Sequence, residues 1–219
     1  MKFENTEVFN FNGALRGMRN PMNSWNKSDS SYDIVYKDFY LGDKDLELAQ
    51  SLIRAGSEHR KFLRQIFVSV DITAPLFWWK EFDTYKVGTV SNSTSTMHKL
   101  SSTPITRDCF EMDDYENISV KSALNNSVGD TDFWWEATIE ILESLRKQYN
   151  ETKDKRYWQE LIRLLPESWL QKRTITMNYE NILNMVRQRS NHKLSEWSIS
   201  FIDWAKTLPY AEELLFLEK

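Results

Sequence analysis

The chain has 219 residues, 41% of them hydrophobic, and a formal net charge of −4. This length and composition suffice for a single compact domain over residues 1–219, and the acidic balance argues against general nucleic-acid binding. No apolar run approaches the roughly 20 residues of a membrane span, and the first residues do not resemble a signal peptide. A cytoplasmic protein with no membrane partner is therefore expected.

The single cysteine narrows the chemistry further. Cys109 stands in an acidic run with Asp108 and Glu111. One cysteine excludes a disulfide framework and a cysteine-ligated metal site, so we expect no metal. Neighbouring negative charge also disfavours a thiolate, which makes Cys109 a poor candidate for a nucleophile.

Hydrophobic spacing predicts an α+β domain in which a small twisted β-sheet is flanked by helices. The clearest strand covers residues 67–73, where apolar and polar side chains alternate. Weaker strand candidates cover 34–39 and 172–177, and residues 101–130 show no sustained period. Helices are predicted over 43–55, 76–85, 131–149, 156–165, 178–189 and 195–206. The adjacent tryptophans at 78–79 and 134–135 are interpreted as packing residues, because neighbours on a helix point about 100° apart.

The most informative stretch runs from residue 67 to 100. Ala74-Pro75 follows the predicted strand, and six of the eight residues from Thr89 to Thr96 are serine or threonine. Such a run is usually a solvated loop. Here it has a lysine at each end and His98 close by, so it can also present hydroxyl and cationic groups to a phosphate or a ribose. Both interpretations remain open on these residues alone.

The stretch resembles the core motif of the flavin-dependent thymidylate synthases. In that family a strand and an Ala-Pro step lead through a helix to R-H-R-x-x-S-x-N-x-x-S-x-R. Residues 72–77, ITAPLF, match the strand-to-helix step, and Thr84-Tyr85-Lys86 falls where R-H-R should be. The remaining motif positions carry Thr89, Ser91, Thr94 and Thr96, so hydroxyls are kept while charges are largely lost.

Three further patches carry the same resemblance in the right order. Residues 178–197 look like the family's C-terminal helix, with Arg189 on its arginine and one extra residue before Trp197. Lys172 or Arg173 occupies the place of an arginine that holds the substrate phosphate. Residues 14–19, ALRGMR, are similar to the family's A-x-R-x-x-R segment.

Members of the family are homotetramers that bind FAD between subunits, take a hydride from NADPH and methylate dUMP. The resemblance implies a homotetramer, FAD as a candidate cofactor and a nucleotide-like small molecule as partner. It names no catalytic nucleophile. The implied cofactor-binding residues are Tyr85, Lys86 and Asn178. The ligand-binding residues predicted from this resemblance together with the hydroxyl-rich run and the cationic cluster around His192 are Lys86, Thr89, Ser91, Asn92, Thr94, Ser95, Thr96, His98, Lys172, Arg173, Arg187, Arg189 and His192.

Two functions compete on this sequence. In the first, the chain binds or sequesters a phosphate-bearing nucleotide and has diverged from catalysis, because threonine cannot neutralise a phosphate and lysine lacks the bidentate geometry of arginine. In the second, it is an active thymidylate synthase in which Lys86, Arg187 and Arg189 replace the lost arginines. A scaffold without a ligand is a third possibility, but it leaves the polar run after Thr89 unexplained.

Overall fold

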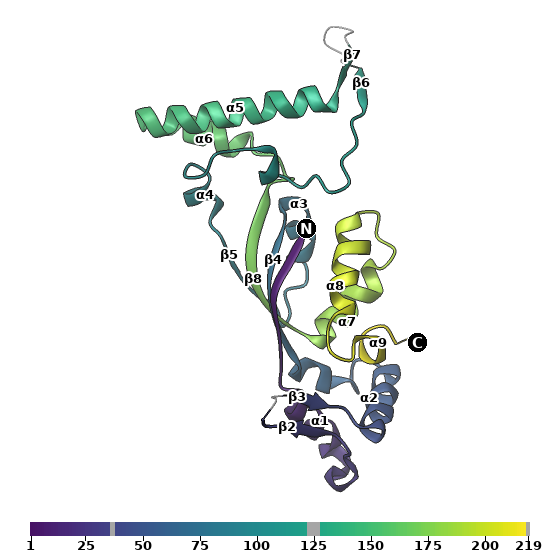
Figure 1. The fold of residues 1–219 in the computed structure, drawn as a ribbon. Helices are drawn as coiled ribbons and strands as arrows, with labels where there is room; N and C mark the ends of the chain where they lie inside the picture. Colours follow the sequence, from purple (N-terminus) through teal and green to yellow (C-terminus); the bar gives the residue numbers. More distant parts are fainter. Residues whose placement is uncertain (36–37, 122–127, 218–219) are drawn as a thin grey trace. The chain divides into compact units, whose positions relative to one another are not determined.

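The computed structural model describes residues 1–35, 38–121 and 128–217 (Figure 1). They form two compact units. The larger unit comprises Lys2–Ile72, Asp83–Asn92 and the chain from Arg173 onward, and the smaller unit comprises Met1, Thr73–Phe82 and Ser93–Lys172. The prediction of one domain over residues 1–219 stays a prediction.

The main sheet has four strands in the order β1-β4-β8-β5. β4 (Phe67–Pro75) and β8 (Leu170–Asn178) confirm the predicted strands at 67–73 and 172–177. Val68, Val70 and Ile72 are buried in β4 while their neighbours are more exposed, as the alternating sequence requires. β4 continues two residues beyond the prediction, through Pro75. The other two strands are β1 (Lys2–Phe9) and β5 (Val90–Ser93).

In the larger unit, the ring of Phe3 in β1 contacts the rings of Phe201 and Trp204. α2 (Asp43–Ala55) has the predicted bounds and ends at Gly56, whose φ of 108° suits glycine. α7 (Tyr179–Arg189) is the predicted helix at 178–189, with Asn178 as its N-cap. The predicted helix at 195–206 is a π-helical turn, η5 (Glu196–Phe201), followed by α8 (Ile202–Lys206). The other elements are α1 (Phe11–Arg19), η1 (Asn20–Met22), η2 (Trp25–Lys27), η3 (Lys61–Gln65) and α9 (Ala211–Leu214).

The strand predicted at 34–39 is wrong over its first half. A hairpin of β2 (Ser31–Asp33) and β3 (Asp38–Tyr40) stands there instead, with Ile34 and Val35 in its turn; residues 36–37 lie outside the described residues. The Asp33 carboxylate accepts a hydrogen bond from the Val35 N–H at 2.8 Å, which favours a turn. The apolar side chains of Ile34 and Val35 are accordingly exposed.

The smaller unit has its own core. α5 (Thr131–Thr152) begins at the predicted residue, and the Asp130 carboxylate accepts a hydrogen bond from the Phe133 N–H at 2.9 Å. Leu142 of α5 is buried with Leu161 of α6 (Lys155–Arg163), which confirms the predicted helix at 156–165. The other elements are α3 (Leu76–Phe82), α4 (Thr96–Lys99), η4 (Arg107–Cys109) and a short hairpin of β6 (Ser119–Lys121) and β7 (Val128–Asp130).

The tryptophan pairs behave differently from one another. Trp134 is 51% exposed while Trp135 packs on the core of the smaller unit, as the angular spacing of helical residues predicts. Trp78 and Trp79 are both buried. The indole N–H of Trp79 donates to the carbonyl of Gln171 at 3.0 Å, so the rings serve packing.

Candidate functional site

The larger unit brings Tyr85 and Arg189 together. Tyr85 follows α3, which ends three residues earlier than predicted, and Arg189 is the last residue of α7. The Nε–H of Arg189 donates to the Tyr85 hydroxyl at 2.9 Å. Its guanidinium carbon lies 5.6 Å from the Tyr85 ring centre and 4.9 Å from that of the fully buried Trp197. Two aromatic rings and a hydrogen bond therefore fix the orientation of this cation.

The Tyr85 hydroxyl uses both of its hydrogen-bonding roles inside the protein. It accepts from Arg189 and donates to the Gln188 side-chain oxygen at 2.9 Å. A phenol has one proton to donate. Tyr85 thus supports Arg189 from the position where the resemblance places the histidine of R-H-R.

Asn178 holds the segment after Tyr85 against the start of α7. Its side-chain oxygen accepts from the Asn181 N–H at 3.0 Å, and the Asn181 oxygen accepts from the Asn178 N–H at 3.2 Å, which makes a reciprocal cap. The Asn181 amide also donates to the Val87 carbonyl at 2.6 Å. Gly88 has a φ of 77°, and a Cβ there would lie 2.7 Å from the Asn178 amide nitrogen. The turn at 86–89 therefore requires both asparagines and this glycine.

The side-chain hydroxyl of Thr89, in that turn, is buried. Its oxygen has no hydrogen-bond partner among the described residues. An unsatisfied buried hydroxyl costs roughly 1–3 kcal/mol. Lys86, Ser91 and Asn92, which flank Thr89 in the sequence, are exposed. This segment consequently offers one unsatisfied hydroxyl beside several solvated groups.

A cluster of guanidinium groups lies on the face of α7 that contacts η3. Glu180 accepts hydrogen bonds from Arg60, at 3.0 Å, and from Arg64, and Arg60 also donates to the Asn184 oxygen at 3.1 Å. Burial alone would raise the pKa of Glu180, but the hydrogen bonds from Arg64 and Arg60 hold that pKa below its ordinary value. The carboxylate is therefore ionised and compensates one of these cations.

Arg187 adds a further positive charge one helical turn beyond Asn184. Partial burial, and secondarily the charge of Arg60, lower the pKa of the Arg187 guanidinium below its ordinary value, although the group stays charged at neutral pH. It makes no hydrogen bond or ion pair with another described residue. Arg60 and Arg64 thus share the Glu180 carboxylate, and the added positive charge of Arg187 favours an anion.

Other predicted residues of the larger unit serve the fold. Arg173 donates to the Asp83 carboxylate at 2.8 Å, with its side chain 14% exposed. The His192 ring nitrogen Nδ1 accepts from the Leu194 N–H at 3.2 Å, in the turn after α7. Neither contact tests a role in ligand binding, which stays a prediction.

The smaller unit holds the remaining predicted residues. Gln171 donates to the Thr94 carbonyl at 2.9 Å and to the Thr96 hydroxyl at 3.2 Å, while the Thr94 N–H donates to the Lys172 carbonyl at 2.9 Å. Ser95 caps α4, accepting from the His98 N–H at 3.3 Å, and its oxygen lies 2.7 Å from His98 Nδ1. The hydroxyl-rich run is therefore a strand end and a helix cap as well as a candidate surface.

Sequence reasoning did not find Arg60, Arg64, Glu180, Asn184 or Gln188. The two arginines stand four residues apart in SEHRKFLRQ, which signals a shared face only if that segment is helical. Gly56 and the short 3₁₀ turn of η3 hide this pattern. Over the described residues, no group of three or more His, Cys, Asp or Glu side chains could hold a metal ion, and no helix has the length and apolar character needed to cross a membrane.

Comparison with known proteins places the fold. No family model matches the sequence, and no curated protein matches it. A structure of the flavin-dependent thymidylate synthase ThyX from Helicobacter pylori, complexed with FAD and dUMP, is similar with a TM-score of 0.67 and 18% identity, covering 99% of this chain and 98% of that chain. A second structure of the same enzyme with FAD and dUMP gives 0.67 and 17%, covering 99% and 97%. The chain has the fold of the flavin-dependent thymidylate synthases, which confirms the predicted mixture of helices and a small sheet.

Proposed function

We propose that this protein binds a phosphate-bearing, nucleotide-like ligand and has diverged from dUMP methylation. The observation that carries the proposal is the contact between Tyr85 and Arg189. The arginine cluster R-H-R is replaced by Thr84-Tyr85-Lys86, and the tyrosine orients a guanidinium instead of supplying a charge. Binding of an anion is supported, whereas the dense positive charge of the family motif is absent.

The ligand's phosphate is assigned to cations of the larger unit. Arg189 is held in one orientation by its ring contacts, and Arg187 has no partner among the described residues. A planar guanidinium binds a phosphate through two parallel hydrogen bonds. The buried hydroxyl of Thr89 supplies a further donor. The solved neighbours of the same fold hold dUMP, which supports a nucleotide as the class of ligand.

FAD fits these residues less well. The resemblance assigns three residues to the cofactor. The Tyr85 hydroxyl is already hydrogen-bonded to Arg189 and Gln188, and the Asn178 side-chain oxygen caps α7. Only Lys86 remains exposed and free of such contacts among the described residues. FAD would supply hydride chemistry if it bound, and we propose that it binds weakly. A homotetramer in the cytoplasm, as the resemblance and composition suggest, is part of the same proposal.

Ligand binding is tested by thermal shift with dUMP. We expect dUMP to raise the melting temperature of the wild type, and Arg189→Gln to abolish most of that rise. Losing a charge-assisted contact weakens binding by about tenfold or more. Arg163→Gln is the matched control, because Arg163 is an exposed arginine paired with Glu160 on α6. An equal rise in wild type and Arg189→Gln would contradict the proposed phosphate contact.

Loss of catalysis is tested by release of tritium from 5-tritiated dUMP, with FAD, NADPH and methylenetetrahydrofolate supplied. We expect no release above background, and a purified protein without the absorbance bands of a flavin. Turnover at rates ordinary for thymidylate synthases would restore the enzyme and reject the divergence. Binding of dUMP without turnover is the result that the proposal requires.

A further inference from the structure

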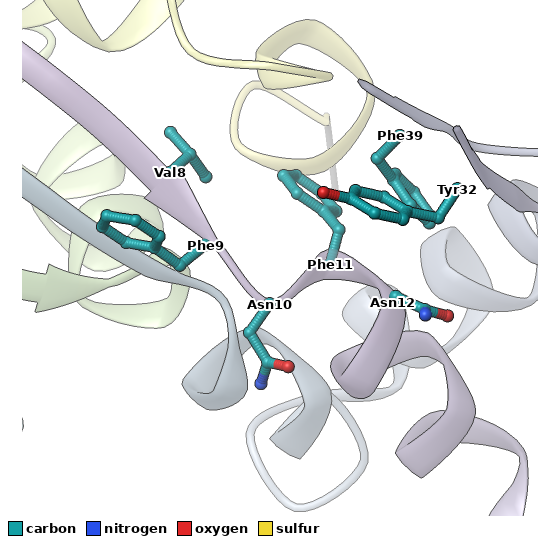
Figure 2. Close-up of a pocket in the computed structure, with 7 residues that line it drawn as sticks. All are labelled: Val8, Phe9, Asn10, Phe11, Asn12, Tyr32 and Phe39. Atoms are coloured by element: carbon teal, nitrogen blue, oxygen red, sulfur yellow. The ribbon is translucent and has the colours of Figure 1, made fainter. Parts of the chain in front are cut away.

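The larger unit contains a second candidate site, far in sequence from Tyr85 and Arg189. A cavity of about 310 Å³ opens between the end of β1 and the β2–β3 hairpin. Figure 2 shows Val8 and Phe9 on one side of it and Tyr32 with Phe39 on the other. Asn10 points away from the rings, and its amide donates to the Gln65 carbonyl at 2.9 Å. The cavity is thus walled mainly by aromatic rings.

These rings differ in how firmly they are held. Phe11 and Phe39 stack with their centres 5.3 Å apart and their planes at 14°, and Phe11 is 7% exposed. Phe9 and Tyr32 are 48% and 46% exposed. A rigid pair at the back and two half-exposed rings at the mouth suit the stacking of a flat ring, since each exposed face gains contact when a ligand enters.

A smaller cavity of about 190 Å³ adjoins the first and shares Asn12 and Phe39 with it. Its lining is more polar. Arg19 contributes there, but its Nε–H donates to the buried Asp45 carboxylate at 2.5 Å. The hydroxyls of Ser28 and Ser30, which also line the cavity, each donate to Asp45 at 2.6 Å. The charges of Arg19 and Asp45 therefore cancel.

Arg16 is the charge that remains. It lines the smaller cavity, is exposed, and makes no hydrogen bond or ion pair with another described residue. Asn12 lies where the two cavities meet and carries both a donor and an acceptor in its exposed amide. An aromatic lobe, an amide and an uncompensated guanidinium follow one another along one cleft.

We propose that this cleft is a ligand site for a planar aromatic molecule that carries one anionic group. The ring lies between Phe9 and Tyr32, the edge of the ring meets the Asn12 amide, and the anionic group pairs with Arg16. None of these residues takes part in the proposed nucleotide contacts of Arg187 and Arg189. The two sites stand or fall separately.

Isothermal titration with 2-naphthoate tests the proposal, with the neutral 2-naphthalenemethanol as the probe without charge. We expect wild type to bind 2-naphthoate with a Kd on the order of 100 µM, and Tyr32→Ala to weaken it roughly tenfold. Arg16→Gln should weaken 2-naphthoate roughly fivefold and leave 2-naphthalenemethanol unchanged. Tyr40→Ala and Arg54→Gln are the control variants. Tyr40 and Arg54 are exposed and do not line either cavity, so both variants should bind 2-naphthoate like wild type.

Several results would overturn the proposal. Absence of binding by wild type up to about 5 mM 2-naphthoate rejects the site. Equal affinity of wild type and Tyr32→Ala rejects the aromatic lobe, and an unchanged affinity for 2-naphthoate in Arg16→Gln rejects the anionic one. Circular dichroism of each variant establishes that it is folded. The dUMP-induced thermal shift should be the same in Tyr32→Ala and wild type, which keeps failure here separate from failure of nucleotide binding.

Discussion

Individual polar atoms define the candidate nucleotide site. Arg189 reaches Tyr85 across 104 residues of sequence, and two aromatic rings lie against its guanidinium. Such ring contacts orient a cation without neutralising its charge. Thr89 gives the complementary signal, because its buried oxygen lacks a partner among the described residues.

Replacing Thr89 by valine separates ligand binding from stability. Thr89→Val exchanges the unpartnered hydroxyl for a methyl group of similar size, so we expect the unfolding free energy to stay equal or rise by about 1 kcal/mol. The dUMP-induced thermal shift should fall. Urea unfolding and thermal shift measure the two effects. Thr103→Val, at an exposed threonine of the smaller unit, is the control. A loss of more than about 1 kcal/mol in Thr89→Val would show that a structural partner satisfies this hydroxyl.

At the scale of elements, helix ends and turns determine where the site residues stand. Asn178 begins α7, and with Asn181 it ties the turn at 86–89 to that helix. Phe82 ends α3 and leaves Tyr85 outside the helix, where its ring contacts Trp197 of η5 and its hydroxyl contacts Gln188 and Arg189 of α7. The buried Asp45 of α2 likewise connects segments near α1, because its carboxylate accepts hydrogen bonds from Arg19, Ser28 and Ser30.

Asn178→Ala removes the cap of α7. We expect it to lower the unfolding free energy by about 1–2 kcal/mol, because the Asn181 backbone N–H loses the side-chain oxygen that accepts its hydrogen bond. Urea denaturation measures the change. The exposed Asn191, which follows α7, provides the matched control Asn191→Ala, expected within about 0.5 kcal/mol of wild type. Equal stability of the two variants would contradict the assigned cap.

Acid should unfold the larger unit through Asp45. Burial alone would raise the pKa of this carboxyl, but hydrogen bonds from Ser28, Ser30 and Arg19 together hold the pKa below its ordinary value. A depressed folded pKa contributes stability that is present above the unfolded pKa of about 3.9 and is lost as pH falls through the folded pKa. We expect urea unfolding to show constant stability near neutral pH and a decline below about pH 4.

The serines around Asp45 provide the test of that assignment. Ser28→Ala with Ser30→Ala removes two of the hydrogen bonds that lower the Asp45 pKa, so stability at pH 7 should fall and the acid transition should begin at higher pH. Ser51→Ala, at an exposed position of α2, should leave both unchanged. An acid transition of the double variant at the wild-type pH would assign acid sensitivity to other carboxylates, such as Glu143, whose hydrogen bonds from Arg146 chiefly lower its pKa to about 2.

For the whole molecule, the sequence resemblance predicts a homotetramer. α5 exposes Phe133, Trp134 and Ile141 by 60%, 51% and 52%, an apolar surface that favours an interface. We expect static light scattering at micromolar concentration to give four times the chain mass of 26.1 kDa. A monomer at that concentration would remove a pocket shared between subunits, and with it the family's arrangement for FAD.

The sequence by itself determined elements whose signal is local. β4 follows from alternating residues at 67–73, α2 from its apolar spacing and Gly56, and α7 from Asn178 and the period after it. Local periodicity records which face of an element is buried, but it does not record which element covers that face. Family resemblance extended this to the fold, and it predicts a role for Arg189 that stays a prediction.

Only the tertiary structure decided which of those residues meet. Arg189 donates a hydrogen bond to Tyr85, and Arg60 donates to both Glu180 and Asn184. The Asp45 carboxylate accepts hydrogen bonds from Arg19 and from two serines. These are hydrogen bonds between distant segments, and their partners are chosen by packing and by the need to satisfy buried charges. The β2–β3 hairpin shows the same limit, because Ile34 and Val35 lie in its turn despite their strand propensity, and the Asp33 carboxylate there accepts a hydrogen bond from the Val35 N–H.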